Sequence, residues 1–257
     1  MLTTTVVAAA AVGVTQGDDW GWGSPATLTM FGVVAVAGPL LVRRARHDPD
    51  ALLDAESFSV RSFSIATVVS MLSQAGFFAF FFSIPLFLID VWGWSTWQAG
   101  VAVAVNQAAS AVVGLPAGRR ADRAGPVGVV VVGGVIAAAG YGWLAIDATV
   151  EPDLWGMLLP AFVLAGVGSM MIGGTISAAA FHDIDDRGLG RAAAAYYVTR
   201  RLGSAAGGVA AVAILGDRIG DDSLTGFRGI WGFATGCYLL AALAMAVGFR
   251  GSGRRAG

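Results

Sequence analysis

Seven side chains that could contact a bound compound lie inside long apolar segments of the sequence. They are Gln74, Phe78, Asn106, Gln107, Met170, Tyr196 and Arg200. Amides beside aromatic rings and flexible methionines suit a broad hydrophobic pocket for an organic molecule. Gln74 and Asn106 are the best candidates for its lining, since polar groups at membrane depth tend to face a cavity. The alternative for each amide is an interhelical hydrogen bond, worth about 0.6 kcal/mol on average.

Arg200 and Arg201 interrupt one apolar segment, one turn after Tyr196 and Tyr197. Long arginine stems can extend to the nearer membrane interface, where the guanidinium stays hydrated. The alternative is an inward-facing arginine on a pathway through the protein. The sequence leaves both interpretations open.

Catalytic and metal-binding chemistry has little support. Ser169 and His182 could form a hydrolytic pair, but no Gly-x-Ser-x-Gly turn surrounds the serine and no third group orients the histidine. His182 and the acids that follow it are typical of a solvated charge cluster. The single cysteine, Cys237, excludes an internal disulfide and a cysteine-ligated metal site. There is no P-loop and no dinucleotide fingerprint, so we expect no enzyme, no metal and no cofactor.

The composition is that of a membrane protein. The 257 residues are 56% hydrophobic and 13% charged, about half the charge of an ordinary soluble domain. The mean hydropathy is +0.71. The formal net charge of −1 gives no basic field for nucleic acid, so the expected partner is the lipid bilayer.

Eight apolar segments are candidates for transmembrane helices, because a bilayer core needs about 20 largely apolar residues in a helix that satisfies its own backbone. They are residues 2–16, 26–43, 62–89, 97–118, 127–146, 154–180, 192–216 and 229–249. The first is short for a full span, and the third has no charged residue. Small residues four apart predict close helix contact at three places. These are Gly114 with Gly118, Gly203 with Gly207, and Gly232 with Gly236.

Arginine and tryptophan predict the orientation independently. With the loop at 119–123 in the cytoplasm, strict alternation places twelve loop arginines inside and only Arg218 and Arg228 outside. All eight tryptophans then fall at the outer ends of spans, where indole rings prefer to lie. We therefore expect a multi-pass plasma-membrane protein with both termini in the cytoplasm.

The loop between the fourth and fifth candidate spans has a dense charge motif. Gly118-Arg119-Arg120-Ala121-Asp122-Arg123-Ala124-Gly125 resembles the glycine, aspartate, arginine and glycine signature of a cytoplasmic loop in the major facilitator superfamily. In that family the loop is taken to act as a latch on the cytoplasmic gate, which the resemblance implies for Gly118, Arg119, Asp122, Arg123 and Gly125. The alternative is a topology anchor, since exposed ion pairs are worth about 0–1 kcal/mol.

Four further segments extend the resemblance over essentially the whole chain. Residues 20–25, 97–100, 166–168 and 200–207 follow the order and spacing of the C-terminal half of the fourteen-helix multidrug-efflux branch. The implied fold is all-α and integral to the membrane, with two extra helices at 1–43 and a six-helix bundle at 62–249. A cytoplasmic connection at 44–61 and a basic tail at 250–257 complete the expected organisation.

The resemblance implies proton-coupled export of amphipathic or cationic organic compounds by alternating access. The branch's first six-helix bundle, with its antiporter motif and its proton-coupling acid, has no counterpart here, so we expect transport to need an N-terminal six-helix half or a second copy. The alternatives are an inactive remnant or helical membrane scaffold and, less favoured, an intramembrane enzyme.

Overall fold

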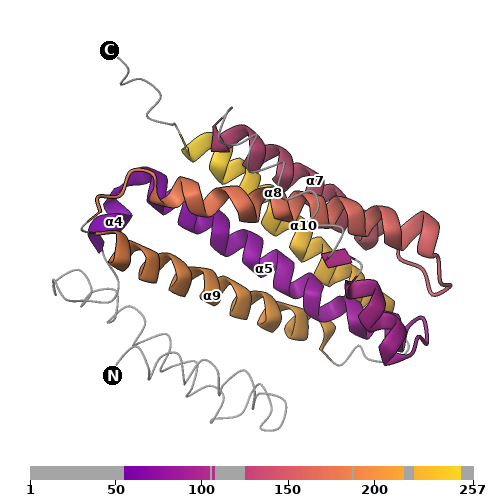
Figure 1. Ribbon diagram of the computed structural model, residues 1–257. Coiled ribbons are helices and arrows are strands. Elements are labelled where there is room, and N and C mark those ends of the chain that lie inside the picture. Colours follow the sequence, from indigo (N-terminus) through magenta and orange to yellow (C-terminus); the bar gives the residue numbers. More distant parts are fainter. Residues whose placement is uncertain (1–54, 105, 108–124, 187, 217–222, 250–257) are drawn as a thin grey trace, which may run out of the picture.

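The computed structural model describes residues 55–104, 106–107, 125–186, 188–216 and 223–249, and every regular element in these residues is a helix (Figure 1). A short helix, α4 (Ala55–Ser59), precedes the long α5 (Arg61–Asp90). Residues 96–104 and 106–107 are helical as well. The chain continues with α7 (Pro126–Asp147), the π-helical turn η1 (Leu154–Leu158), α8 (Leu159–Phe181), α9 (Leu189–Leu215) and α10 (Ser223–Gly248).

Five of these helices are long and apolar enough to cross a membrane, counting η1 and α8 together as Leu154–Phe181. They correspond to the predicted spans at 62–89, 127–146, 154–180, 192–216 and 229–249, which confirms the all-α membrane fold. The predicted span at 97–118 is described only in part, and those at 2–16 and 26–43 lie outside the described residues.

The last span begins earlier than predicted, at Ser223 instead of residue 229. The predicted span starts directly after Arg228, which the prediction counts as a loop arginine. In the structure a guanidinium nitrogen of Arg228 donates a hydrogen bond of 2.6 Å to the carbonyl oxygen of Ala148, just beyond the end of α7. The helix therefore includes the arginine and uses it to hold the neighbouring helix end.

Helix α5 lies at the centre of the bundle and packs against α8, α9 and α10, while α7 packs against α8 and α10 (Figure 1). The helices alternate in direction. Phe63 contacts Phe181, and Phe80 contacts Phe162, so α5 and α8 are antiparallel. We call the end where α5 and α9 begin the α4 end, and the opposite end the tryptophan end.

The contact between α5 and α9 depends on small residues, as predicted. A Cβ added to Gly203 or Gly207 would overlap the main-chain carbonyl of Met71 or Ala75. The two backbones can approach this closely because neither glycine has a side chain. The predicted pair Gly232 and Gly236 has no such neighbour within 4 Å in the described structure. The pair at 114 and 118 lies outside the described residues.

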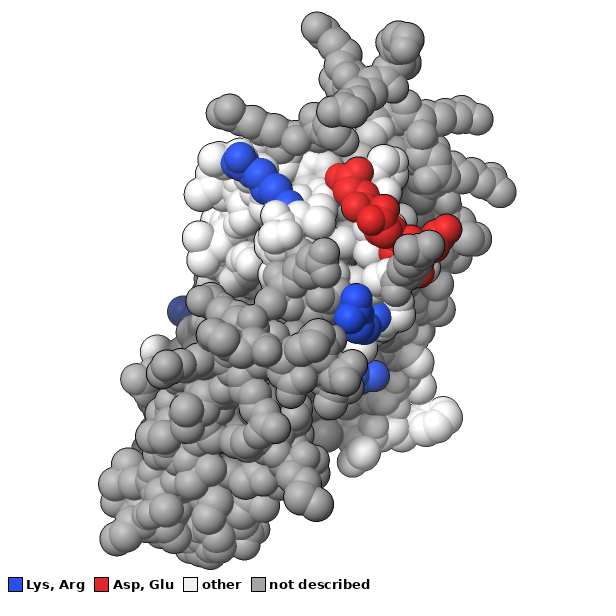
Figure 2. Space-filling view, turned by 90° about the vertical axis from the view of Figure 1, so that its left-hand side faces the viewer, with Lys and Arg blue, Asp and Glu red and all other residues white. Residues whose placement is uncertain are grey.

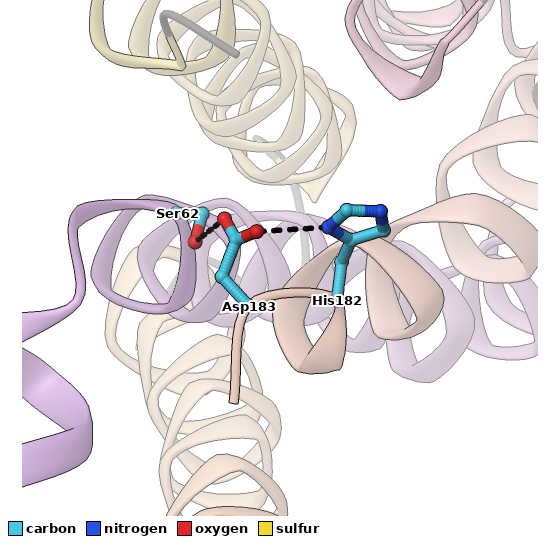
Figure 3. A network of polar contacts seen from close by, with 3 residues as sticks. All are labelled: Ser62, His182 and Asp183. Carbon is cyan, nitrogen blue, oxygen red and sulfur yellow. Dashed lines mark hydrogen bonds and ion pairs between the residues drawn. The ribbon is translucent and has the colours of Figure 1, made fainter. Parts of the chain in front are cut away.

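Hydrogen bonds join the helices at the α4 end. The Nε of Arg61 donates to the carbonyl oxygen of Gly248 at 3.0 Å, which connects the start of α5 to the end of α10. The Ser62 hydroxyl donates to Asp183 at 2.7 Å, and the His182 ring contacts the same carboxylate at 2.9 Å (Figure 3). These two contacts hold the pKa of Asp183 below its ordinary value, the histidine making the larger contribution.

Acidic side chains gather in one patch on the face of the α4 end, and arginine side chains lie apart from it (Figure 2). Asp183, Asp185 and Asp186, which follow α8, are exposed at this end. At the opposite end the Trp92 indole donates to the Thr149 carbonyl oxygen at 3.0 Å, and Trp97 and Trp155 are 79% and 78% exposed. The described tryptophans thus lie at the opposite end of the bundle from the starts of α5 and α9, which agrees with the predicted alternation of span directions. The cytoplasmic assignment of the α4 end stays a prediction.

Candidate functional site

A cavity of about 410 Å³ is lined from α5, α8, α9, α10 and Gln107, and it opens on the bundle surface, where Tyr197 and Arg201 are exposed. Its polar lining is made of two amides, two arginines and four hydroxyls. The lining residues are Ser73, Gln74, Phe77, Phe78, Gln107, Gly166, Ser169, Met170, Gly173, Tyr197, Arg200, Arg201 and Tyr238. We call this the central cavity.

Five of the seven predicted pathway residues meet in the central cavity: Gln74, Phe78, Gln107, Met170 and Arg200. They come from segments up to 126 positions apart in the chain, so only the helix packing can bring them together. The structure therefore shows that these five residues line the same cavity. Their role in binding stays a prediction.

The wall contributed by α5 combines an amide with aromatic rings. Phe78 lies one turn beyond Gln74, and the Phe77 ring contacts those of Phe78 and Phe81 at centroid distances of 5.7 and 5.9 Å. The Gln74 amide donates to the Ser204 hydroxyl of α9 at 3.4 Å. Gln74 thus makes an interhelical hydrogen bond and also lines the cavity, so the two alternatives for this amide do not exclude each other.

Arg200 and Arg201 both line the central cavity from α9. Arg200 is eleven residues after the first residue of a 27-residue helix, about 16 Å from its start at 1.5 Å per residue. Arg200 is half-buried and Arg201 is exposed, and the choice between an inward-facing arginine and extension to the interface stays a prediction. Within the described part of the chain, neither guanidinium has a hydrogen-bond or ion-pair partner.

A chain of three hydroxyls crosses the bundle beside the cavity. The Ser169 hydroxyl of α8 hydrogen-bonds the Tyr141 hydroxyl of α7 at 3.0 Å and the Tyr238 hydroxyl of α10 at 2.7 Å. Both tyrosine side chains are buried, and their rings are 5.1 Å apart. Sequence reasoning missed the two tyrosines. The available signal was a tyrosine inside each apolar span, because a buried tyrosine hydroxyl usually finds a partner.

Two predicted pathway residues lie elsewhere. Asn106 is buried and donates to the carbonyl oxygen of Phe162 at 3.0 Å, beside a second, largely apolar cavity of about 450 Å³ near Trp94 and Trp97. Tyr196 is fully buried against Phe181, with ring centroids 5.3 Å apart. The central cavity is lined instead by the next residue in each case, Gln107 after Asn106 and Tyr197 after Tyr196.

Most of the predicted gating loop lies outside the described residues, including Gly118, Arg119, Asp122 and Arg123. Gly125 is described and has φ +83°, a backbone region that favours glycine. It directly precedes Pro126, the first residue of α7, where the missing N–H of proline costs no helix hydrogen bond. Gly125 therefore ends the loop and starts the helix.

The residues considered for catalysis do not come together. Ser169 is bonded to two tyrosines within the bundle, while His182 follows the end of α8, about 20 Å further along the helix at 1.5 Å per residue. In the described residues no three histidine, cysteine or acidic side chains form a group that could hold a metal ion.

Comparison with known proteins identifies the family. The family model described as Major Facilitator Superfamily matches residues 2–208. A Multidrug resistance protein B homolog of Mycobacterium tuberculosis is 27% identical over 157 residues, which cover 61% of this chain and 29% of the relative. A Tetracycline resistance determinant of Streptomyces rimosus is 29% identical, with 60% of this chain and 44% of the relative covered.

The Multidrug efflux pump LfrA of Mycolicibacterium smegmatis is 32% identical over 118 residues, which cover 46% of this chain and 23% of that pump. The chain thus matches less than half the length of each of these relatives. With a family model covering most of its residues and five apolar helices of membrane-spanning length, this chain is a multi-pass membrane protein that belongs to the major facilitator superfamily.

Proposed function

We propose that this chain is the C-terminal half of a plasma-membrane transporter that exports small amphipathic organic compounds in exchange for protons. The observation that carries the proposal is the central cavity, with its amides, aromatic rings and methionine. Such a lining accommodates ligands of varied shape, because thioether and aromatic side chains provide apolar contact without strict geometry. The names of the relatives, which describe multidrug and tetracycline resistance, support a transport role.

The depth of the cavity supports this role. Measured from the α4 end at 1.5 Å per residue, Gln74 lies about 20 Å along α5, and Met170 and Arg200 lie about 16 Å along α8 and α9. If the hydrocarbon core, about 30 Å thick, begins near the α4 end, all three residues lie near its middle. Transporters with alternating access bind substrate at this level, between two bundles that rock against each other.

Two features support a requirement for a second bundle. The described helices form one bundle, and alternating access needs two. None of the five described spans has an acidic residue between its ends, so the proton-coupling carboxylate of the proposed antiport would come from another bundle. We propose that an N-terminal six-helix half, or a second copy of this chain, provides that bundle. The loop at 118–125 would then act as the cytoplasmic latch, with both termini on the same side.

An export assay tests this proposal. Cells express the chain alone, the chain together with an N-terminal six-helix half, or neither, and accumulation of a fluorescent amphipathic dye is followed before and after a protonophore. We expect export only when both halves are present, with full loss after the proton gradient collapses. The DNA upstream of Met1 shows whether such a half is encoded.

Each result decides a separate part of the proposal. Robust proton-driven export by the chain alone would overturn the requirement for a second bundle. Export that survives the protonophore would overturn proton coupling. Lack of export with both halves at the membrane would favour the inactive remnant or scaffold.

A further inference from the structure

The central cavity is positively charged at membrane depth. Its two formally charged residues are Arg200 and Arg201, and none of the residues that line it is acidic. The described acidic residues of the bundle lie at or beyond helix ends, such as Asp90, Asp147 and Asp183. A cation would therefore meet two like charges in the cavity, while an anion would meet two opposite charges.

The two guanidiniums have free hydrogen-bonding capacity. Each has five N–H donors, and within the described chain the side chains of Arg200 and Arg201 have no hydrogen-bond or ion-pair partner. Arginine at membrane depth is costly unless it is paired or hydrated. Its planar fork matches the oxygens of a carboxylate or sulfonate, and such charge-assisted hydrogen bonds are roughly twice as strong as neutral ones.

The surrounding groups suit the rest of an organic anion. The Phe77 and Phe78 rings and the Met170 side chain border the same cavity and provide apolar contact. The Gln74 amide lines the same cavity, donates to Ser204 one turn after Arg200 on α9, and has a second N–H. The site therefore combines an apolar surface with donors at one side, the arrangement that an amphipathic anion requires.

We propose that the substrates of the central cavity are amphipathic organic anions, whose carboxylate or sulfonate is bound by Arg200 and Arg201. This inference rests on the proposed function and narrows it, since it selects anions from the broader class of small amphipathic organic compounds. The same anionic oxygens could come from a carboxylate of the second bundle, and the test separates these two sources.

The test uses two dyes that differ by a single group. 1-Anilinonaphthalene-8-sulfonate has a sulfonate that N-phenyl-1-naphthylamine lacks, and binding of each to the full chain in lipid nanodiscs is followed by energy transfer from tryptophan, with empty nanodiscs subtracted. In Arg200→Gln we expect the Kd of the sulfonate dye to rise about tenfold, because a charge-assisted hydrogen bond is lost. The Kd of the neutral dye should change less than twofold. Arg200→Lys keeps the charge and should stay within about threefold of the parent chain.

Arg191→Gln is the matched control, since Arg191 lies on the same helix near the α4 end and does not line the cavity. It should leave both Kd values unchanged. The cationic dye ethidium should bind more tightly to Arg200→Gln than to the parent chain, because a repulsive charge has been removed. Thermal unfolding confirms that each variant is folded.

The proposal is overturned if a folded Arg200→Gln, Arg201→Gln double variant keeps the sulfonate affinity, or if ethidium binding falls in parallel with it. Binding of neither dye also overturns it. If sulfonate selectivity is present in the chain alone and disappears when the second bundle is bound, a carboxylate of that bundle occupies Arg200 and Arg201. This result would overturn the proposal that the two arginines bind an anionic substrate. Dye binding requires neither export nor proton coupling. If the cavity binds the sulfonate dye selectively but the export assay fails, the transporter proposal is rejected and the anion site is not.

Discussion

The close contact of α9 with α5 makes Gly207→Val a sharp test of the packing. A Cβ on Gly207 would lie 2.8 Å from the carbonyl carbon of Ala75 and nearer still to its oxygen, against at least 3.4 Å in an ordinary contact. The obstacle is backbone, so the side chain cannot rotate away and the helices must part by on the order of 1 Å. Overpacking of this kind costs about 1–3 kcal/mol. The Gln74–Ser204 hydrogen bond, already 3.4 Å long, should break as well.

Gly208→Val is the matched control, because Gly208 is the next residue on the same helix and has no atom within 4 Å of an added Cβ in the described structure. Both variants lose the flexibility of glycine and gain a β-branched side chain, so their difference isolates the contact with α5. We expect Gly207→Val to unfold at a clearly lower temperature than Gly208→Val.

The chain contains its own reporter for this measurement. Cys237 is its single cysteine, and the thiol is free and buried in α10. A thiol-reactive fluorophore in detergent therefore responds when the bundle opens. Equal unfolding temperatures for Gly207→Val and Gly208→Val would refute the inferred approach of α5 and α9.

Three further predictions use the same reporter. Ser169→Ala should destabilise the bundle more than Tyr238→Phe, because it leaves two buried hydroxyls unpaired, at about 1–3 kcal/mol for each unsatisfied group. Trp231→Phe should cost about 1 kcal/mol, because the indole N–H of Trp231 donates to a buried serine hydroxyl at 3.1 Å. Asp183→Asn should destabilise the protein by under about 1 kcal/mol near pH 7, where the exposed Asp183 carboxylate is paired with His182.

The sign of the pH effect at Asp183 follows from its lowered pKa. The stabilisation is complete above the ordinary aspartate pKa of about 3.9 and is lost as the pH falls through the lower folded value. The gap between the parent chain and Asp183→Asn should therefore close below about pH 4, where unfolding is followed by tryptophan fluorescence because the thiol does not react at this pH. A gap that widens on acidification would contradict the assignment.

Two controls use a residue's exposure and its hydrogen-bond partners. Trp97→Phe changes a highly exposed indole and should leave the unfolding temperature unchanged, in contrast to Trp231→Phe, and equal losses would refute the buried hydrogen bond. The double variant Ser169→Ala, Tyr238→Phe should be less destabilised than the sum of the single variants, because the two residues are direct partners. Strict additivity would refute the hydroxyl chain.

Much of the architecture follows from composition along the chain. A run of about 20 apolar residues has to be helical in a bilayer, because the backbone finds no other hydrogen-bond partners there. The predicted spans at 62–89 and 127–146 accordingly agree with α5 and α7 within one or two residues. The start of α10 was wrong by six residues because a charge marks a span end only when it has no partner inside the bundle, and Arg228 has one.

The face of each helix was less predictable from sequence. Asn106 and Gln107 are consecutive polar residues, yet one donates to the backbone of α8 and the other lines the central cavity. Likewise, Tyr196 is buried in the core while Tyr197 lines the central cavity. Residues one apart on a helix point about 100° apart, so residue type alone cannot tell which of two similar neighbours faces the cavity.

The sequence by itself determined that this chain is helical, spans a membrane in alternating directions and places polar side chains at mid-depth, because lipid forces each segment to satisfy its backbone internally. Tertiary structure alone decided which of those side chains meet. In a span that is apolar on nearly every side, no amphipathic stripe marks the packed face, and contacts such as Gly207 on Ala75 set the rotation of each helix. That rotation turns Arg200 and Arg201 to the central cavity and leaves Tyr196 in the core.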